Sequence, residues 1–230
     1  MKTLVIISHP NILESSSQQF LIKAIPHHFD VTVHHLENEY PDWNINVAKE
    51  QKLLSEHDRI IFQFPFYWYS SPALLKHWQD MVYTEDFAFH ARGKALRGKE
   101  FGLVLSVGIN EAEYQAGGRE MFSISELTRP FQATAEKLGM TYLKPFSIFQ
   151  FGYMTDEQRF QLAIHYQQVL TREKDNSLEA KEKWIMEQLT NMDKASLSTD
   201  DKIVLENAVE SLKNNRHTID ELKLILEQMW

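Results

Sequence analysis

Short apolar segments alternate with longer helical stretches over most of this 230-residue chain, and no other feature restricts the fold as strongly. The short segments are rich in β-branched and aromatic residues, and they read TLVII (3–7), VTVHHL (31–36), RIIFQF (59–64), FGLVLS (101–106) and YLKPFSIF (142–149). Residues with helical spacing lie between and after them, over 16–26, 46–56, 71–83, 119–138 and 155–171. Strands that alternate with helices predict βαβ crossovers and a parallel sheet covered on both faces.

Three of these strands are nearly continuous apolar runs, as burial on both faces of a sheet requires. Five such strands indicate an α/β fold with a flavodoxin-like five-stranded parallel sheet, in the order 2-1-3-4-5. Sheets of this kind bind their ligands beyond the carboxyl ends of the strands. We therefore expect the functional residues directly after strands one, three and four.

The end of the chain has a different composition. All eight glycines lie at or before Gly152 and all seven prolines at or before Pro145. We expect a first domain over 1–174 and an all-helical extension over 175–230. Its helices are expected near 177–191, 199–213 and 219–229, with N-terminal caps at Ser198 and Thr218.

Composition excludes several classes of function. A formal net charge of -8 argues against nucleic acid and against anionic membranes as partners. The absence of cysteine excludes disulfides, thiol nucleophiles and thiolate metal sites. The ten histidines show no metal-binding spacing, and the adjacent pairs at 27–28 and 34–35 are interpreted as surface or strand-end residues, so no metal site is expected. The apolar run in MKTLVIISHP is too short for a secretory signal or a membrane span, which predicts a cytoplasmic protein without membrane insertion.

The segment after strand one reads SHPNILESSSQQF and contains neither of the glycine-rich phosphate loops. Ser15, Ser16 and Ser17 stand where a helix begins, and hydroxyls with free N–H groups at a helix N-terminus can bind phosphate. The same serines also suit an ordinary N-cap. His9 either faces a ligand or packs at the strand end.

The segment after strand three, FPFYWYSSPALLKHW, is unusually aromatic for a loop. Pro65 ends ladder pairing, and Ser71 with Pro72 is expected to cap the next helix. Aromatic residues are more often core. At the mouth of a sheet, however, these rings suit the walls of a flat heteroaromatic ligand that stacks on Trp68 and accepts backbone hydrogen bonds.

The segment after strand four reads SVGINEAEYQAGG. Gly108 allows a close approach of the backbone, and Tyr114 offers a hydrogen-bond donor.

Together the three loops resemble the flavodoxin-like NAD(P)H dehydrogenase (quinone) family. The similarity is greatest to its short bacterial members, such as the ancillary oxidoreductase of glutathione-gated potassium efflux systems. It extends over about residues 1–172, and the segments that carry it are SHP (8–10), YPDWNI (40–45), EQ (50–51), FPFYWYSSPALLKHWQDMV (64–82), ALRGK (95–99) and PFQATAEKLGM (130–140).

The resemblance implies a tightly bound flavin, FMN with FAD as the alternative, and NAD(P)H as electron donor. The acceptor it implies is a quinone or an azo or nitro compound, reduced by two electrons in ping-pong fashion. By position, the resemblance implies that the flavin phosphate and ribityl chain are bound by His9, Ser15, Ser16, Ser17 and Gln18. The residues implied to line the isoalloxazine ring are Phe66, Tyr67, Trp68 and Tyr69. Those implied to contact its pyrimidine side are Ser106, Val107, Gly108 and Ile109.

Two positions depart from the family pattern. Members usually carry Thr-Thr-Gly-Gly after strand four, whereas this chain has a side chain at Ile109 that is expected to reshape the contact. Tyr114 matches the tyrosine of a Tyr–His catalytic pair, but no histidine follows before His165. Tyr114 is therefore the single catalytic candidate, and positioning is expected to carry the reaction.

The resemblance also implies a homodimer with each flavin near the interface. The helical extension then either enlarges that interface, covers the substrate entrance or packs on its own domain. Three classes of function stay open, namely a reductase, a regulatory docking subunit of a cation transporter, and a flavodoxin-type electron carrier. The carrier is the least favoured class, because the matching loops are those of the reductases.

Overall fold

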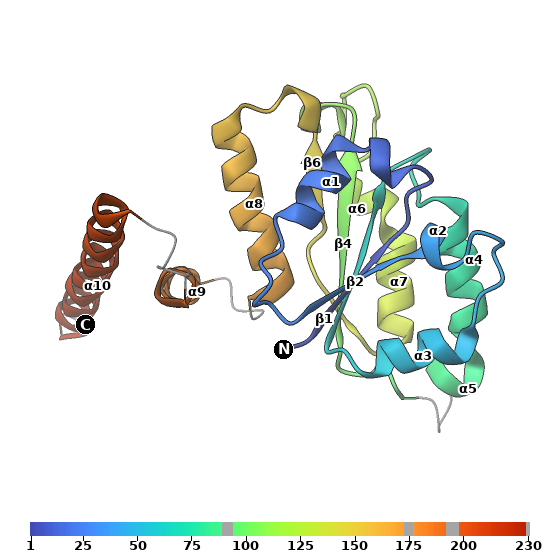
Figure 1. Cartoon of the computed structure of the whole chain (residues 1–230), viewed down its shortest axis with the longest axis horizontal. Coiled ribbons are helices and arrows are strands. Elements are labelled where there is room, and N and C mark those ends of the chain that lie inside the picture. The colour runs from blue at the N-terminus through green and yellow to red at the C-terminus, as the bar shows by residue number, and fades with distance from the viewer. Residues whose placement is uncertain (89–93, 173–176, 192–197, 229–230) are drawn as a thin grey trace. The chain divides into compact units, whose positions relative to one another are not determined.

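The computed structural model describes residues 1–88, 94–172, 177–191 and 198–228 (Figure 1). The chain forms two compact units, Met1–Thr171 and Arg172–Trp230, and each is described by itself. Within the described ranges, no helix is long and apolar enough to cross a membrane.

The first unit is built on a parallel sheet. Its strands are β1 (Thr3–Ile7), β2 (Val31–His35), β3 (Arg59–Pro65), β4 (Glu100–Val107), β5 (Thr141–Tyr142) and β6 (Phe146–Phe149). Their order is β2-β1-β3-β4-β5, with β6 pairing β4 further along that strand. The order 2-1-3-4-5 predicted from the sequence is confirmed.

The expected fifth strand over 142–149 is wrong in one respect, because the chain makes two short strands there. Lys144 and Pro145 lie in the gap between β5 and β6. A proline has no N–H to donate to the ladder, which explains why pairing with β4 stops before Pro145 and resumes after it.

Helices cover both faces of the sheet (Figure 1). On one face, α1 (Ser16–Lys23) and α8 (Asp156–Thr171) bury apolar residues such as Leu21 and Leu162 against Val5 and Ile61. The other face is covered by α3 (Val47–Ser55), α4 (Ala73–Val82) and α7 (Arg129–Lys137). The short helices are α2 (Leu36–Glu39), α5 (Glu85–Ala88) and α6 (Ile124–Leu127), with 3₁₀ turns η1 (Ile12–Glu14), η2 (Glu111–Glu113) and η3 (Phe151–Tyr153).

Two expected helix starts differ from the structure. The helix expected over 119–138 is divided at Thr128 into α6 and α7, because Pro130 is tolerated only in the first turn of a helix. Ser71 does not cap α4, which begins at Ala73 and takes Pro72 as a cap residue without a side-chain hydrogen bond.

The second unit contains α9 (Leu178–Asn191) and α10 (Thr199–Gln228). Ser198 caps α10 as expected, with its Oγ accepting from the N–H of Asp201 at 3.1 Å. The turn expected within NNRHT is wrong, because α10 continues through it. Thr218 is a helical residue there, and its hydroxyl donates to the carbonyl of Asn214 one turn earlier. Without glycine or proline in that stretch, nothing in the backbone ends the helix.

Apolar contact within the second unit is limited. Trp184 on α9 and Leu205 on α10 are its buried hydrophobic residues among those described, and Arg216 Nε donates to Glu182 Oε2 at 2.7 Å across the pair. Leu222 and Ile225 near the end of α10 are exposed.

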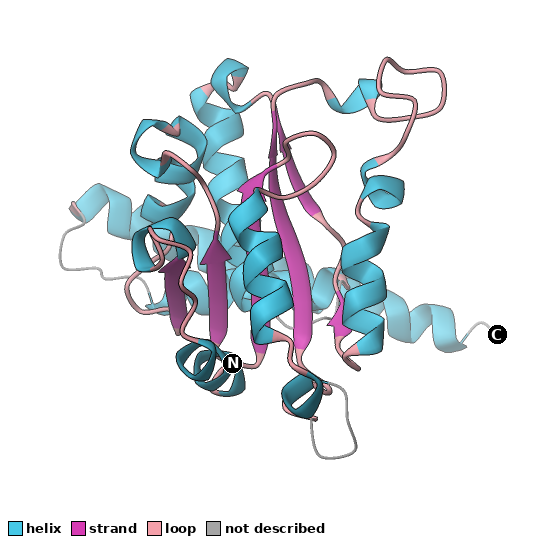
Figure 2. Cartoon of the chain, turned by 90° about the vertical axis from the view of Figure 1, so that its right-hand side faces the viewer, coloured by secondary structure: helices cyan, strands magenta, loops and turns pink. Residues whose placement is uncertain are grey.

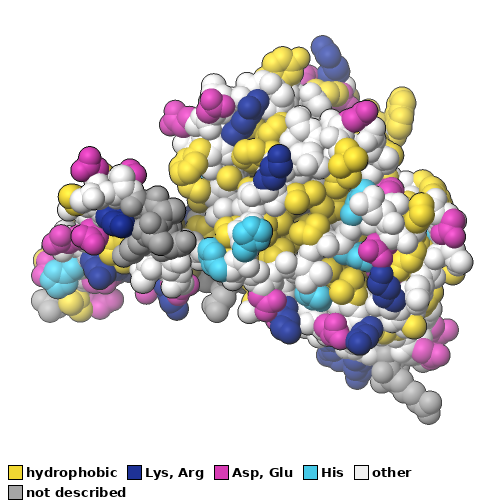
Figure 3. Space-filling model, in the orientation of Figure 1, with side chains coloured by type: hydrophobic (Ala, Val, Ile, Leu, Met, Phe, Trp, Pro, Cys, Tyr) yellow, Lys and Arg dark blue, Asp and Glu magenta, His cyan; other side chains and the backbone are white. Residues whose placement is uncertain are grey.

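The surface of the first unit is of mixed character. On the face visible in Figure 3, hydrophobic side chains are interspersed with single lysines, arginines and acidic residues. This face therefore offers no continuous positive surface to a phosphate backbone.

Candidate functional site

Three loops meet at the carboxyl edge of the sheet. Ile7 on β1 pairs with Gln63 on β3, and Pro65 on β3 pairs with Ser106 on β4. Because these strands are parallel neighbours, the residues that follow them emerge side by side. Figure 2 shows the strand arrows ending on one side of the sheet, with the connecting loops beyond them.

The loop after β1 leads into the N-terminus of α1. Ser15 is the N-cap, and its Oγ accepts from the N–H of Gln18 at 3.4 Å and lies 3.3 Å from the hydroxyl of Ser17. The N-cap interpretation is therefore confirmed for Ser15. It does not exclude the other, since the hydroxyls of Ser15, Ser16 and Ser17 and the first-turn N–H groups gather at one helix end, as phosphate sites require.

Gln18 lies on the inner side of this loop. It is fully buried, and its Oε1 accepts from Gln63 Nε2 at 2.6 Å, while its own Nε2 lies 3.5 Å from Ser106 Oγ. Gln63 Oε1 in turn accepts from the hydroxyl of Tyr166 on α8 at 2.7 Å. The side-chain amide of Gln18 thus connects α1 to the sheet and is not part of the group of serine hydroxyls.

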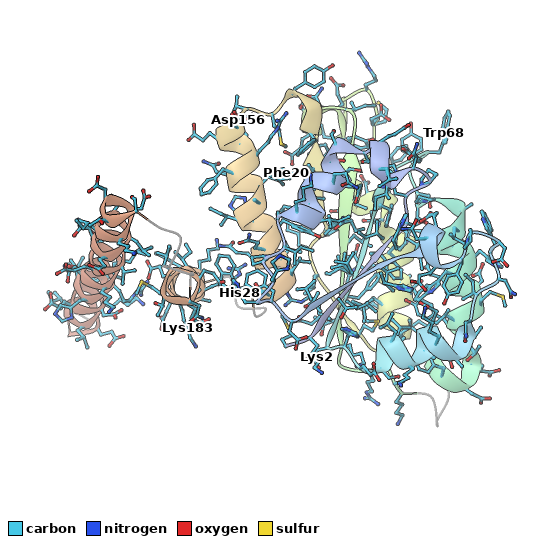
Figure 4. The ribbon with its side chains drawn as sticks, in the orientation of Figure 1. Lys2, Phe20, His28, Trp68, Asp156 and Lys183 are labelled. Carbon is cyan, nitrogen blue, oxygen red and sulfur yellow. The ribbon has the colours of Figure 1, made fainter. Side chains whose placement is uncertain are left out.

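The aromatic loop after β3 divides into a buried and an exposed part. Phe66 is 8% exposed, packs 6.4 Å from the ring of Tyr114, and donates its N–H to the Ser106 carbonyl at 3.0 Å. Trp68, by contrast, is 93% exposed, and Figure 4 shows its side chain pointing away from the body of the first unit. The core interpretation holds for Phe66 and fails for Trp68.

A tight turn holds the exposed part in place. The N–H of Ser70 donates to the Tyr67 carbonyl at 2.9 Å, and the two residues between them, Trp68 and Tyr69, have φ angles of 46° and 63°. Bulky residues seldom adopt this left-handed conformation, which is strained and is found where function requires it. In the part of the chain that the structure describes, the N–H groups of Trp68 and Tyr69 have no acceptor, so both are available to a ligand.

The loop after β4 contributes mainly backbone. Val107 is buried, and its carbonyl accepts from the N–H of Gln150 at 2.8 Å. A side chain at Gly108 would meet open space, so this peptide is accessible from outside. Ile109 packs against the apolar core, and its side chain is thereby directed to the protein.

Tyr114 closes the apolar end of the site. Its ring centroid lies 6.4 Å from that of Phe66 and 6.1 Å from that of Phe149. Burial, assisted by the charge of Glu120 and by Tyr69, raises the pKa of Tyr114, so its hydroxyl keeps its proton at neutral pH. His165 is exposed on α8, which covers the opposite face of the sheet, and therefore cannot complete a Tyr–His pair.

Sequence reasoning missed a polar cluster beside the first loop. Glu37 on α2 accepts from the Ser8 hydroxyl at 2.7 Å and from the His9 N–H at 2.9 Å, and lies 3.1 Å from His35 Nε2. Burial acts to raise the pKa of Glu37, but hydrogen bonds from His35, Ser8 and His9 outweigh it and hold that pKa below its usual value. The available signal was the position of His35 at the end of the strand beside β1.

Similar contacts hold the two histidines of this cluster. Burial acts to lower the pKa of His35, yet the bonds to Glu37 and to the His9 carbonyl prevail and raise it. Burial lowers the pKa of His9, and Glu37 offsets only part of that shift. Among the described residues, no three histidine or acidic side chains gather to hold a metal ion.

Comparison with known proteins agrees with this geometry. Residues 1–170 match the family model described as having a flavodoxin-like fold. The chain belongs to that family. A protein of Bacillus subtilis named "Uncharacterized NAD(P)H oxidoreductase YrkL" is 51% identical over 152 residues, which are 66% of this chain and 86% of that protein. The expected class of enzyme, an oxidoreductase of this family, is confirmed.

Other relatives carry more specific names. The crystal structure of an NADPH-quinone reductase from P. pentosaceus has a TM-score of 0.70 and 46% identity, and covers 74% of this chain and 98% of its own. General stress protein 14 from Treponema denticola, solved in complex with FMN, has a TM-score of 0.66 and 39% identity over 72% of this chain and 95% of its own. The potassium-efflux ancillary protein KefG of Cronobacter sakazakii is 39% identical over 64% of this chain and 80% of its own length.

Proposed function

We propose that this protein is an FMN-dependent NAD(P)H oxidoreductase that reduces quinones or similar acceptors by two electrons in ping-pong fashion. The aromatic turn after β3 carries the proposal. Trp68 and Tyr69 are held in a strained left-handed conformation, with free N–H groups and exposed rings. Such strain costs free energy in the folded protein and is found mainly at sites where function requires it.

The phosphate end of the flavin fits the N-terminus of α1. Ser15, Ser16 and Ser17 offer hydroxyls, and the N–H groups of the first turn together with the helix dipole favour an anion there. His9, buried at the start of the same loop, supplies a further donor. Gln18 would act indirectly, because its buried side chain anchors α1 to Gln63.

The ring end fits the loops after β3 and β4. The N–H groups of Trp68 and Tyr69 and the open backbone at Gly108 would bind the polar edge of the isoalloxazine, and Tyr67 with Trp68 would cover its face. When bound, FMN supplies a ring that takes a hydride from NAD(P)H and returns two electrons to the acceptor. The protonated hydroxyl of Tyr114 is the side-chain donor proposed to stabilise negative charge during that transfer.

Relatives support the choice of cofactor and substrate class. The FMN complex of general stress protein 14 favours FMN over the alternative, FAD. The names NAD(P)H oxidoreductase and NADPH-quinone reductase, carried by proteins similar along the first unit, favour NAD(P)H as donor and a quinone-like acceptor. A homodimer and a cytoplasmic location stay predictions.

A second candidate function is a docking subunit of a cation transporter. It is favoured by the similarity to KefG, whose name assigns it to a glutathione-regulated potassium-efflux system. The two functions are compatible in one protein. The gene for a potassium–proton antiporter beside the gene for this protein would support the second, and its absence would favour a free-standing reductase.

The test of the proposed function is a flavin titration of the apoprotein. At saturating FMN, binding to the folded state alone raises the melting temperature, with about 2.7 kcal/mol of added stability at a hundredfold excess over Kd. The loaded protein should then lose its visible flavin absorbance on addition of NAD(P)H and regain it with a quinone. If neither FMN nor FAD moves the melting temperature, the proposed function is wrong.

A further inference from the structure

The strand pairing places Glu37 and His35 beside the start of the loop after β1. Ile7, the last residue of β1, pairs with His35, the last residue of β2. Ser8 and His9 follow β1 directly, and Glu37 is the second residue of α2. Glu37 is thereby within reach of both residues that begin the loop.

The proton on His35 is fixed by its surroundings. Its Nε2 lies 3.1 Å from Glu37 Oε2 and 3.1 Å from the carbonyl oxygen of His9. Both neighbours are acceptors, so Nε2 must carry a hydrogen and share it between them. His9 is consequently held on both sides, with its N–H donated to Glu37 and its carbonyl accepting from His35.

The ring of His9 is held in one tautomer as well. Its Nδ1 accepts from the N–H of Asn11 at 3.1 Å, so the lone pair lies on Nδ1 and the proton of the neutral ring lies on Nε2. Burial lowers the pKa of His9 and keeps the ring in this neutral form. In the described part of the chain, the Nε2–H has no acceptor of its own.

We infer that Glu37 and His35 are positioning residues that hold His9 as a neutral Nε2–H donor for the phosphate of the bound flavin. The inference rests on the proposed function and adds residues from β2 and α2 to a site otherwise formed by the loops after β1, β3 and β4. The Glu37 carboxylate has three donors within hydrogen-bond distance, which satisfy its oxygens in this partly buried position.

A purely structural role for the cluster predicts a different result. If Glu37 only stabilised the loop after β1, its loss would weaken FMN by the same factor with or without the ring of His9, because the serines at the N-terminus of α1 lie in that loop. If Glu37 acts through His9 on the phosphate, only FMN should be affected, because riboflavin has no phosphate.

The experiment compares Glu37→Gln with a control, Glu39→Gln, in titrations of the apoprotein with FMN and with riboflavin. Glu39 is exposed on the same short helix and pairs with Lys49 at the surface. Glu37→Gln should weaken FMN about tenfold, a factor that corresponds to ~1.4 kcal/mol, and leave riboflavin within about twofold. The control should leave both ligands unchanged.

A variant of His35, the partner of Glu37, provides a second test in case Glu37→Gln does not fold. His35→Phe keeps a ring of similar size but removes the Nε2 donor, and it should show the same selective loss of FMN. In a His9→Ala background, Glu37→Gln should have no further effect on FMN, because its effect passes through the ring that is missing.

Several outcomes would overturn the inference. Equal weakening of FMN and riboflavin, unchanged FMN affinity, or additive effects of the His9 and Glu37 substitutions would each reject it while the proposed function stands. Failure of the wild-type protein to bind either flavin would instead reject the proposed function, and the inference with it.

Discussion

Gln63 on β3 and Tyr166 on α8 stand 103 positions apart and share a buried hydrogen bond, with the tyrosine hydroxyl donating to Gln63 Oε1 at 2.7 Å. Gln63 also donates to Gln18, so the bond belongs to a chain of side chains that joins α8, the sheet and α1. Both Gln63 and Tyr166 are fully buried, and water cannot replace the partner that either would lose.

Tyr166→Phe should therefore lower the free energy of unfolding by about 1–3 kcal/mol, because the Gln63 carbonyl is left buried without its donor. Urea denaturation measures the change. Tyr153→Phe is the control, since Tyr153 is 85% exposed and should tolerate the same removal. Equal stability of Tyr166→Phe and wild type would show that the bond contributes nothing.

Trp68→Ala should separate ligand binding from folding. The side chain is 93% exposed, so its removal should change the stability of the apoprotein by no more than about 0.5 kcal/mol. Loss of a ring stacked on the flavin should weaken FMN by about 1 kcal/mol or more. Thermal unfolding of the apoprotein and an FMN titration measure the two effects.

A control for Trp68 is Phe160→Ala. Phe160 is 67% exposed in the first turns of α8, whose start at Asp156 lies on the other side of the first unit from Trp68 (Figure 4). The Phe160→Ala variant should retain normal FMN affinity. An unfolded Trp68→Ala apoprotein would mean that Trp68 belongs to the core.

Stability should depend on pH through Glu50. Burial acts to raise its pKa, but His34, whose Nε2 lies 3.0 Å from the carboxylate, and hydrogen bonds from Tyr40 and Trp78 outweigh burial and hold the pKa below the ordinary 4.5. A carboxyl whose folded pKa is lowered stabilises the protein above its unfolded pKa, and that contribution is lost as pH falls through the folded value.

Glu50→Gln should accordingly be about 2 kcal/mol less stable than wild type at neutral pH. The difference should shrink as the pH is lowered from about 5 towards about 3, because the wild-type carboxyl becomes neutral. Chemical denaturation across that range measures it. The control is Glu56→Gln, which makes the same change at an exposed acid at the end of α3. A difference in the free energy of unfolding between wild type and Glu50→Gln that does not change with pH would contradict the prediction.

Truncation after Thr171 should leave a folded, flavin-binding reductase. The cut coincides with the end of the first compact unit and keeps the bond from the Thr3 hydroxyl to the Leu170 carbonyl, 2.7 Å long, that ties the end of α8 to β1. Flavin content and the mass from size-exclusion chromatography, measured on both proteins, test this and reveal any change of oligomeric state. An insoluble or flavin-free product would show that the extension belongs to the core or the site.

Strand positions could be predicted from the sequence, because burial on both faces leaves a local signature. Continuous apolar runs such as 3–7 and 59–64 need no knowledge of their neighbours to be recognised. The serines at the start of α1 and the aromatic run after β3 were found in the same way, since each lies within one short segment.

Errors of prediction arose where two local signals competed. Pro145 interrupts the last strand instead of lying within it, and Thr128 divides what helical spacing presented as one helix. Thr218 was expected to cap a new helix. It lies instead within the helix that begins at Thr199, and its hydroxyl donates to the Asn214 carbonyl. In each case the neighbouring structure decided between the two signals.

The amino-acid sequence by itself determined the α/β class and the segments that form strands, because periodicity and turn chemistry act over a few residues. Only the tertiary structure decided which polar groups meet. Glu37 reaches the N–H of His9 across 28 positions, and Tyr166 reaches Gln63 across 103. A hydrogen bond requires two groups within about 3 Å. Such contacts between distant segments exist only after the sheet has brought the strand ends together.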